Sequence, residues 1–473
     1  MPRQTALNWI EENDSLIVRV SNTIWEFAEL GLEEFRSSKL ISDTLKKAKF
    51  DVETGVAGMQ TAFVATYGSG NPIIGVLGEY DALPGLSQKA QPKKEPIMQR
   101  TSGHGCGHNV FGAASMGAAI ALKEAITTKN LKGTVKFFGC PAEETFLGKV
   151  FMARDGVFDG LDAALCWHPS MTNTVWMSSS LASNAVRFNF HGISAHAAAS
   201  PEQGRSALDA VELMNVGTNY LREHITEKAR IHYVITKGGN VPNVVPSEAQ
   251  VWYYIRSPRR YQVEELYGKV QNIARGASMM TDTTVDFDLT GGCHDFVPNK
   301  TLSYLMLANM KQLGPPEWTT NEIAFAKKLS ESFTSDQKKT TMKSMNVPRL
   351  GEKMGKVLDD TVDDPEDEGE ILPASTDVGD VSYIVPTAQI LVATTILGAP
   401  FHSWQMTATS GMSIGHKGGI LAAKAIALTG VDLLTKAQVL KEVKEEFVTN
   451  GIRYKSFLPR DLRPFPITVR DQN

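Results

Sequence analysis

Short apolar runs rich in β-branched residues alternate with helical stretches over most of this chain, and this alternation restricts the fold more than any other feature. Buried strands are expected at residues 61–67, 73–77, 134–138, 163–166 and 390–395, and long helices at 109–128 and 413–434. Strands that alternate with helices in this way are typical of layered α/β proteins. A central sheet flanked by helices is therefore expected.

A different texture interrupts this pattern after residue 183. Four longer alternating strands and two helices are expected between residues 184 and 294, which fits a separate four-stranded sheet with two helices on one face. The earlier pattern then resumes. We therefore interpret 1–183 and 295–473 as two parts of one domain, and 184–294 as a second domain inserted into it. A chain of 473 residues is also too long for one ordinary core.

The composition is that of a globular protein that acts on small molecules. A net charge of -4 and a pI near 6.2 give no electrostatic reason to expect nucleic acid or a membrane as a partner. The four cysteines match neither a CxxC pair nor a secreted disulfide framework, and residues 1–14 do not resemble a signal peptide. No apolar stretch is expected to cross a membrane. These features predict a cytoplasmic protein.

Residues 337–370 form a polar stretch that interrupts the second part of the larger domain. Its end, residues 359–370, contains eight acidic side chains in twelve residues. Runs of like charge are usually solvated. We therefore expect a mobile surface insertion here, in preference to an acidic binding site.

The glycine-rich turn before the helix at 109–128 concentrates metal-binding residue types. Cys106 and His108 are separated by one glycine in this turn, and His104 lies just before them. Thiolate sulfur and neutral imidazole nitrogen are preferred donors for Zn²⁺, and glycines let the backbone bring both toward one point. Alone, the turn fits a buried thiol or a nucleophilic cysteine equally well.

Three further segments place ligand or acid–base residues just after buried strands. Ligands gather at the carboxyl ends of strands in open α/β sheets. Glu143 and Glu144 are adjacent, so in extended backbone one can bind metal while the other faces substrate. His168 stands before Pro169, which we expect to terminate its strand, and His402 lies in a loop after the strand at 390–395. Asp81, in the turn after another strand, is suited to orient a ligand imidazole.

Together these segments resemble the M20 metallopeptidase and amidohydrolase family, and the resemblance runs nearly end to end. The motifs that carry it are Gly78-Glu-Tyr-Asp-Ala-Leu-Pro84, Gly103-His-Gly-Cys-Gly-His-Asn109, Pro141-Ala-Glu-Glu144, Trp167-His-Pro169, Gly192-Ile-Ser-Ala-His-Ala-Ala198 and His402-Ser-Trp404. The resemblance implies a zinc-exopeptidase-like domain, with a mixed central sheet flanked by helices, and an inserted α+β four-stranded dimerisation domain.

The resemblance also implies a site with two divalent ions, Zn or Mn. Its ligands would be Cys106, His108, Glu144, His168 and His402. Glu143 would be the general base, and Asp81 the acidic residue that orients the site. The chain departs from the family at Glu79, where aspartate is commoner, and at Asn109.

Three residues of the inserted domain match family positions that act on the substrate. The residue matching His196 reaches the cleft of a neighbouring subunit and stabilises the oxyanion, which implies a dimer. Asn243 and Arg256 match positions that hold a substrate carboxylate, although a structural Arg256 paired with a nearby acid remains equally open.

The expected activity is hydrolysis of the amide bond of an N-acyl amino acid. Segments 374–382 and 413–418 and the long insertion are most similar to the branch that cleaves p-aminobenzoyl-glutamate, so this is the favoured substrate. The dimer would be a homodimer or a heterodimer with a homologous A-type subunit. Alternatives are an aminoacylase or dipeptidase of the same family, a cysteine amidohydrolase with Cys106 as nucleophile and His108 or His104 as base, and a non-catalytic metal-binding subunit.

Overall fold

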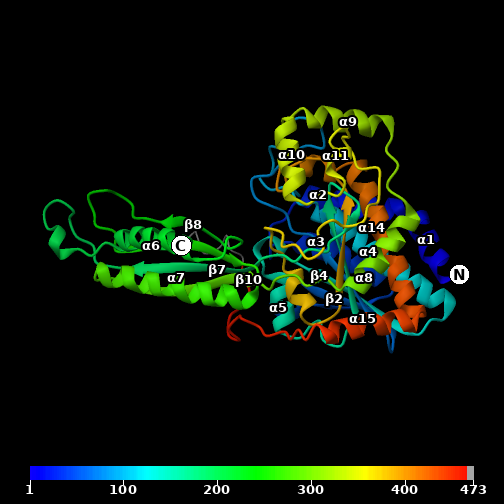
Figure 1. The fold of residues 1–473 in the computed structure, drawn as a ribbon, viewed down its shortest axis with the longest axis horizontal. Coiled ribbons are helices and arrows are strands. Elements are labelled where there is room, and N and C mark those ends of the chain that lie inside the picture. The colour runs from blue at the N-terminus through cyan, green and yellow to red at the C-terminus, as the bar shows by residue number, and fades with distance from the viewer. Residues whose placement is uncertain (466–473) are drawn as a thin grey trace.

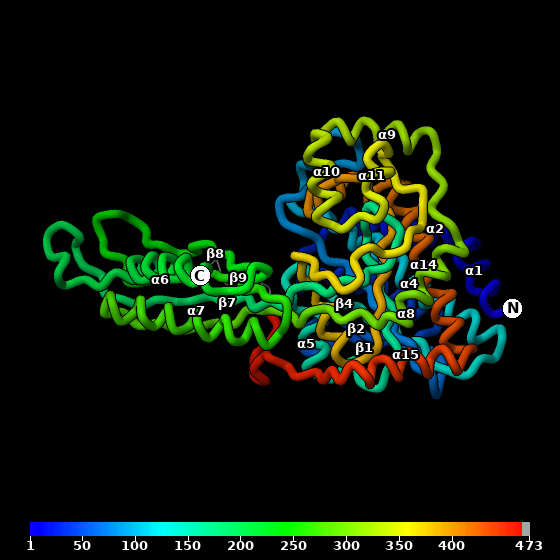
Figure 2. Tube along the Cα trace, in the orientation of Figure 1, coloured from blue at the N-terminus to red at the C-terminus, as the bar shows by residue number. Residues whose placement is uncertain are grey.

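The computed structural model describes residues 1–465 and contains two separate sheets. Figure 1 shows the larger domain as a helix-covered sheet and the smaller one as an arm that projects from its side. Figure 2 shows that the chain leaves the larger domain once and returns to it, so that the arm is an excursion between two halves of that domain. The predicted α/β class, with a mixed central sheet and an additional four-stranded sheet, is confirmed.

The sheet of the larger domain has seven strands in the order β1-β2-β4-β3-β5-β11-β6. Its four central strands are parallel, and β1, β2 and β6 pair antiparallel at the edges. The strands are β1 (Asp51–Thr54), β2 (Phe63–Ser69), β3 (Ile73–Glu79), β4 (Gly133–Cys140), β5 (Ala163–Ser170), β6 (Thr174–Val175) and β11 (Thr387–Ala393). The carboxyl ends of β3, β4, β5 and β11 therefore meet at one edge, where ligands bind in open α/β sheets.

Helices α4 (His108–Lys129) and α14 (Ser413–Thr435) pack side by side against this sheet. Both are apolar around most of their circumference, as expected of helices covered on all sides. Small residues allow the close approach, since a side chain at Gly419 would collide with Val110 of α4. By length and composition both helices are long and apolar enough to cross a membrane, but most of each is buried within the protein, as in core helices.

Further helices cover the larger domain and join its strands. The first 50 residues contain three helices, and the chain breaks at Asn13 between the first two. The elements are α1 (Pro2–Glu12), α2 (Asp14–Phe27), α3 (Phe35–Lys47), η1 (Val56–Gly58), η2 (Glu143–Thr145), α5 (Gly148–Arg154), α8 (Lys300–Leu313), α9 (Thr320–Ser330), α10 (Ser335–Ser344), α11 (Leu350–Lys353), α12 (Val378–Ser382), α13 (Trp404–Ser410) and α15 (Ala437–Thr449).

The arm is an antiparallel sheet in the order β10-β7-β9-β8 with two helices on one face. Alternate residues of β9 point into the core beneath the helices, as the period of a strand requires. The elements are β7 (Ala182–His191), η3 (Pro201–Gln203), α6 (Ala207–Leu221), η4 (Arg222–His224), β8 (Arg230–Lys237), β9 (Glu248–Ser257), α7 (Arg260–Met280) and β10 (Thr284–Cys293). Among the residues that the structure describes, strand β8 is an edge strand, paired on one side only.

The acidic run at 359–370 is built into the larger domain. The side chains of Asp359, Asp363 and Asp367 are buried. Lys353, itself buried, forms ion pairs of 2.9 Å with Asp359 and 2.5 Å with Asp363. Asp359 also accepts a hydrogen bond from the backbone N–H of Asn173 at 2.9 Å. The expectation of a solvated loop is therefore wrong for these three acids, because each has a buried donor.

Candidate metal centre

Five possible metal ligands from four separate motifs meet at the carboxyl edge of the seven-stranded sheet. Sγ of Cys106 and ring nitrogens of His108 and His168 all lie within 4.8 Å of one another. Cys106 belongs to a second such group, with a carboxylate oxygen of Glu144 and a ring nitrogen of His402. The thiol is thus common to two sets of three donors. This arrangement suits two divalent ions that share one sulfur ligand.

The turn that carries Cys106 and His108 depends on the glycine between them. Gly107 has φ +78°, a left-handed conformation that glycine adopts without strain, and it directly precedes α4. A side chain there would also approach Pro169 to 2.9 Å. The bend lets the thiol and the imidazole face the same point.

Hydrogen bonds leave one nitrogen of each buried histidine turned toward the cluster. Nδ1 of His108 lies 2.8 Å from Oδ1 of Asp81, while its Nε2 is buried without a hydrogen-bond partner in the described structure. Nδ1 of His168 lies 2.8 Å from the carbonyl oxygen of Pro169. A carbonyl only accepts hydrogen bonds, so Nδ1 carries the proton and Nε2, 3.5 Å from Sγ of Cys106, is free to bind metal.

His168 lies inside its strand, which corrects the expectation that Pro169 ends it. Strand β5 continues to Ser170. Its pairing with β3 stops at Leu165, whereas its pairing with β11 continues. A proline is tolerated there because one side of the strand needs no further ladder hydrogen bonds.

The protonation equilibria fit a site that takes cations. Burial, reinforced by the charge of Asp81, raises the pKa of Glu144 to about 8. Burial also raises the pKa of the Cys106 thiol above its ordinary value, and lowers that of His168 to about 3. His168 is therefore a neutral imidazole, the form that binds metal. A bound cation would stabilise the ionised forms of Glu144 and Cys106, which burial disfavours. An unpartnered carboxylate oxygen of Glu144 adds to the fit, because divalent cations would satisfy it.

Glu143 and Glu144 face different parts of the cluster although they are adjacent. They lie in η2, after a left-handed Ala142, instead of in extended backbone. A carboxylate oxygen of Glu143 groups with Glu79 and His108, whereas one of Glu144 groups with Cys106 and His402. A carboxylate apart from the two cysteine-containing sets is thus in place beside them.

His402 forms the open side of the cluster. Its side chain is 54% exposed, and its Nε2 lies 3.3 Å from Oε2 of Glu144. Its φ of +54° is unusual for a residue that is not glycine, and such strained conformations occur most often at functional sites. Water and substrate therefore have access from the His402 side.

A buried lysine that sequence reasoning missed lies behind the cluster. Nζ of Lys149 forms ion pairs of 2.6 Å with Oε1 of Glu79 and 2.5 Å with Oδ1 of Asp377. All three side chains are fully buried. Burial alone would lower the pKa of Lys149, but the charges of Asp377 and Glu79 outweigh it and raise this pKa well above its ordinary value. Lys149 therefore carries a positive charge among the acids.

Arg256 reaches from the arm toward the cluster. Its Nη1 donates a hydrogen bond of 3.3 Å to Oγ of Ser375, and its guanidinium lies 5.7 Å from the ring of Phe146 and 5.3 Å from that of Tyr254. Its charge also helps to lower the pKa of His402, after burial and the charge of His108. Within residues 1–465 no carboxylate lies within ion-pair distance of Arg256. The guanidinium is therefore available to an anion.

Comparison with known proteins agrees with the metal-dependent hydrolase family that these metal-binding residues suggest. Residues 75–400 match the family model of "Peptidase family M20/M25/M40". The chain is 42% identical to the B subunit of p-aminobenzoyl-glutamate hydrolase of Escherichia coli K12, covering 97% of this chain and 98% of that protein. The chain belongs to peptidase family M20. It is thus a hydrolase of a family that acts on amide bonds.

Two further relatives show how far the likeness extends. The Xaa-Arg dipeptidase of Mus musculus is 28% identical, over 94% of this chain and 92% of that protein. The crystal structure of Bacillus subtilis YxeP, described as a dinuclear metal-binding peptidase of family M20, superposes with a TM-score of 0.56 at 16% identity, over 90% of this chain and 99% of that one. The zinc-exopeptidase-like fold expected for an M20 protein is confirmed.

His196 and Asn243 are brought together, but away from the cluster of their own chain. Residue 196 bridges Val244, and the backbone N–H of Ala197 donates to the carbonyl oxygen of Asn243 at 3.0 Å. Both lie at the tip of the arm, beyond the far ends of β7 and β9, whereas Arg256 lies where β9 reaches the larger domain. Most of a ten-residue strand, on the order of 25 Å, separates Asn243 from Arg256. Within one chain they do not form one carboxylate site.

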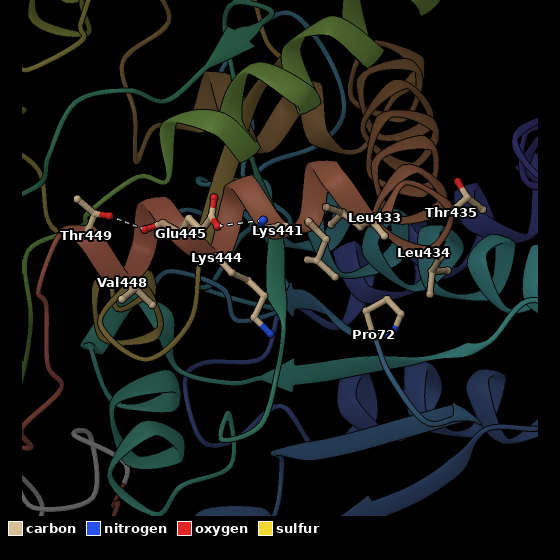
Figure 3. A pocket seen from close by; sticks show the side chains of 11 residues that line it. Pro72, Leu433, Leu434, Thr435, Lys441, Lys444, Glu445, Val448 and Thr449 are labelled. Atoms are coloured by element: carbon tan, nitrogen blue, oxygen red, sulfur yellow. Dashed lines mark hydrogen bonds and ion pairs between the residues drawn. The ribbon is translucent and has the colours of Figure 1, made fainter.

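A separate cavity of about 840 Å³ lies outside the M20 site. It is formed by the end of α14, by α15 and by Pro72, as Figure 3 shows. Its walls combine apolar residues such as Leu434 and Leu440 with the ion pair between Lys441 and Glu445. None of the cluster residues lines it, so this cavity is not the catalytic cleft.

Proposed function

We propose that this M20 protein is a dinuclear metal amidohydrolase that cleaves p-aminobenzoyl-glutamate into p-aminobenzoate and glutamate. The observation that carries the proposal is the sharing of Cys106 between two sets of three donors, with the carboxylate of Glu143 beside them. The 42% identical relative is named for this substrate. Cys106, His108 and His168 would hold one ion, and Cys106, Glu144 and His402 the other. Thiolate and imidazole favour Zn²⁺, and the carboxylate also suits Mn²⁺.

The bound ions would supply a water of lowered pKa and a polarised scissile carbonyl. Glu143 takes the proton of the attacking water and passes it to the nitrogen of the leaving amine. Asp81 keeps His108 in the orientation that this chemistry needs, through the hydrogen bond to Nδ1. Breaking the amide bond thus requires one buried carboxylate that serves first as base and then as acid.

Arg256 binds a carboxylate of the amino acid on the amine side of the scissile bond. Its planar fork matches the two oxygens of a carboxylate, and its lack of an acidic partner within residues 1–465 supports this role. The aromatic rings of Phe146 and Tyr254 lie beside it. A glutamate leaving group satisfies this site.

His196 acts in a neighbouring subunit. Its Nδ1 accepts hydrogen bonds from the backbone N–H groups of Ala198 and Ala199 at 3.2 and 3.1 Å, so Nε2 carries the proton. An exposed N–H donor of this kind suits a developing oxyanion. Its place at the tip of the arm supports delivery to a second chain, together with Asn243.

Dimerisation through the arm is consistent with its open edge. Within residues 1–465 strand β8 has an unpaired side, and Tyr233, Val234 and Ile235 are exposed along it. An exposed apolar edge strand is a template for pairing with another strand. The partner is a second copy of this chain or a homologous A-type subunit, and both remain open because the relatives include A and B types of the hydrolase. The molar mass of the purified protein, alone and with an A-type protein, distinguishes them.

The deciding experiment combines metal analysis with a panel of amide substrates. The panel varies the acyl group and the carboxyl-terminal amino acid, and includes p-aminobenzoyl-glutamate, N-acetyl amino acids and dipeptides ending in arginine. Hydrolysis of p-aminobenzoyl-glutamate that chelation abolishes supports the proposal. Preference for N-acetyl amino acids or dipeptides assigns an aminoacylase or a dipeptidase. Activity that survives chelation points to Cys106 as a nucleophile, and bound metal without turnover points to a non-catalytic subunit.

We also propose a cytoplasmic location for the protein. All four cysteines are free thiols within the described residues, which suits a reducing compartment. Cell fractionation with an antibody against the protein tests this, and recovery with an oxidising compartment contradicts it.

A further inference from the structure

Lys149, Glu79 and Asp377 form a buried chain of charges that the proposed reaction does not use directly. Asp377 is fixed at both oxygens: Oδ2 accepts from the backbone N–H of Lys149 at 2.9 Å, and Oδ1 accepts from its Nζ at 2.5 Å. Nζ of Lys149 also reaches Oε1 of Glu79 at 2.6 Å. The lysine side chain is therefore fixed between two carboxylates, one of which belongs to the edge of the metal cluster.

The other oxygen of Glu79 points into the cluster. Oε2 of Glu79 lies 3.3 Å from Nε2 of His108, the nitrogen that Asp81 leaves free. This oxygen has no hydrogen-bond partner within the described residues and is buried. Atoms of Glu79, His108 and Glu143 lie within 4.8 Å of one another. A third carboxylate thus faces the half of the centre that contains His108.

We propose that Lys149 and Asp377 are positioning residues that hold the Glu79 carboxyl group against the His108 side of the metal centre, and that this clamp sets how tightly the centre retains its ions. The inference rests on the proposed function, because it needs a metal at this place. The unpartnered oxygen of Glu79 would face a divalent cation favourably. Without its lysine, the buried carboxyl group would lose much of that orientation.

The segment that supplies Asp377 provides a matched control. Asp377 and Asp380 flank the same turn, as the N-cap and an interior residue of α12, and both are fully buried. Asp380 accepts instead from the backbone N–H of His294 at 2.8 Å and contacts Nδ1 of its ring at 2.8 Å. Asp377→Asn and Asp380→Asn therefore make the same chemical change at one short helix. Only the first alters a partner of Lys149, which in turn contacts Glu79.

The experiment measures metal retention and metal-free stability side by side. Full-length wild-type protein and both variants are dialysed against increasing chelator, zinc and manganese per chain are counted, and the thermal midpoints of the metal-free forms are recorded. We expect Asp377→Asn to weaken metal retention about 10- to 100-fold and Asp380→Asn to change it less than about threefold. The metal-free midpoints of the two variants should be similar.

A second variant covers the case in which Asp377→Asn does not fold. Glu79→Gln replaces the carboxyl group that faces the metal with an amide and should cause the same loss of metal. Wild-type retention in either variant, or an equal loss in Asp380→Asn, overturns the clamp while leaving the amidohydrolase proposal intact. A wild-type protein that takes up no divalent ions overturns the proposed function instead, so the two failures are distinguishable.

Discussion

Nδ1 of His108 lies 2.8 Å from Oδ1 of Asp81, and both side chains are fully buried. Oδ2 of the same aspartate accepts the backbone N–H of Glu144 at 3.0 Å. One carboxylate thus fixes an imidazole from the start of α4 and the turn that carries a second proposed ligand. Two segments far apart in the sequence keep their relative position through this residue.

The first prediction follows from that contact. Asp81→Ala should weaken metal retention about 10- to 100-fold, because His108 loses the partner that fixes its ring. Metal counted per chain after dialysis against chelator measures the effect. Asp43→Ala, which removes an exposed acid paired with Lys39, is the control and should retain metal as wild type does. Equal retention in both variants would remove Asp81 from this role.

Glu143→Gln separates metal binding from proton transfer. The variant should keep its metals, since Glu143 lies outside both cysteine-containing sets, and should lose about 10²- to 10⁴-fold in kcat. Steady-state rates and metal analysis on the same sample check both halves. A variant that keeps more than about a tenth of the wild-type kcat is incompatible with Glu143 as the general base.

Arg256→Ala tests the carboxylate site. We expect a rise in KM of about 10- to 100-fold for substrates that end in glutamate, because a charge-assisted contact to the substrate is lost. Ser375→Ala removes the hydroxyl that contacts Arg256 and should raise KM much less. If Arg256→Ala lowers the Tm strongly and leaves KM unchanged, the arginine is structural.

His196 is expected to act across a dimer, and mixed dimers reveal this. His196→Ala and Glu143→Gln chains with different tags are each nearly inactive, but a hybrid contains one site with both residues intact. In a random mixture about half of the dimers are hybrids, so roughly a quarter of wild-type activity should return. Doubly tagged hybrids that remain inactive would show that His196 does not act in the neighbouring subunit.

The ion pair between Glu322 and Lys417 predicts a dependence of stability on pH. Burial alone would raise the pKa of Glu322, but hydrogen bonds from Lys417, Ser413 and Thr319 lower it to about 2. The contribution of ionised Glu322 to the free energy of unfolding is therefore complete above pH 4.5 and is lost as the pH falls through about 2. Glu322→Gln should cost about 1–2 kcal/mol at neutral pH, and its Tm should approach that of wild type as the pH falls toward 2. As a control, Glu317→Gln, which changes an exposed acid, should have the same Tm as wild type at every pH.

Much of the site could be expected from local patterns. Strand ends are visible in sequence as apolar runs that stop at glycine, proline or charged residues, and the parallel order of β3, β4, β5 and β11 brings those ends together. Only the family resemblance implied that His168 and Glu144 are metal ligands, but their positions near these strand ends could be predicted from local patterns. The Lys149 chain could not, because it joins three segments more than 60 residues apart, and a lysine in a short helix gives no local sign of burial.

Other features depend on tertiary context in the same way. Apolar spacing continues from Ile10 to Ile17 across the break at Asn13, so periodicity alone merges α1 with α2. The composition of residues 359–370 indicates solvation because it does not show where the backbone donors of a distant loop lie. His196 and Asn243 have local hydrogen bonds of their own, and their separation from Arg256 follows only from the length of the arm.

The acidic run also has a mechanical consequence. Beyond His168 the chain turns through residues 171–181, whose backbone N–H groups at Asn173, Met177 and Ser178 are bonded to Asp359 and Asp367. The run thus anchors the segment that directly follows a proposed ligand in the chain. Trimming it would not simply shorten a surface appendage, because it would leave three backbone N–H groups without acceptors in a segment whose Trp176 ring lies 6.5 Å from that of His168. Changes in its length are therefore tied to the position of that proposed ligand.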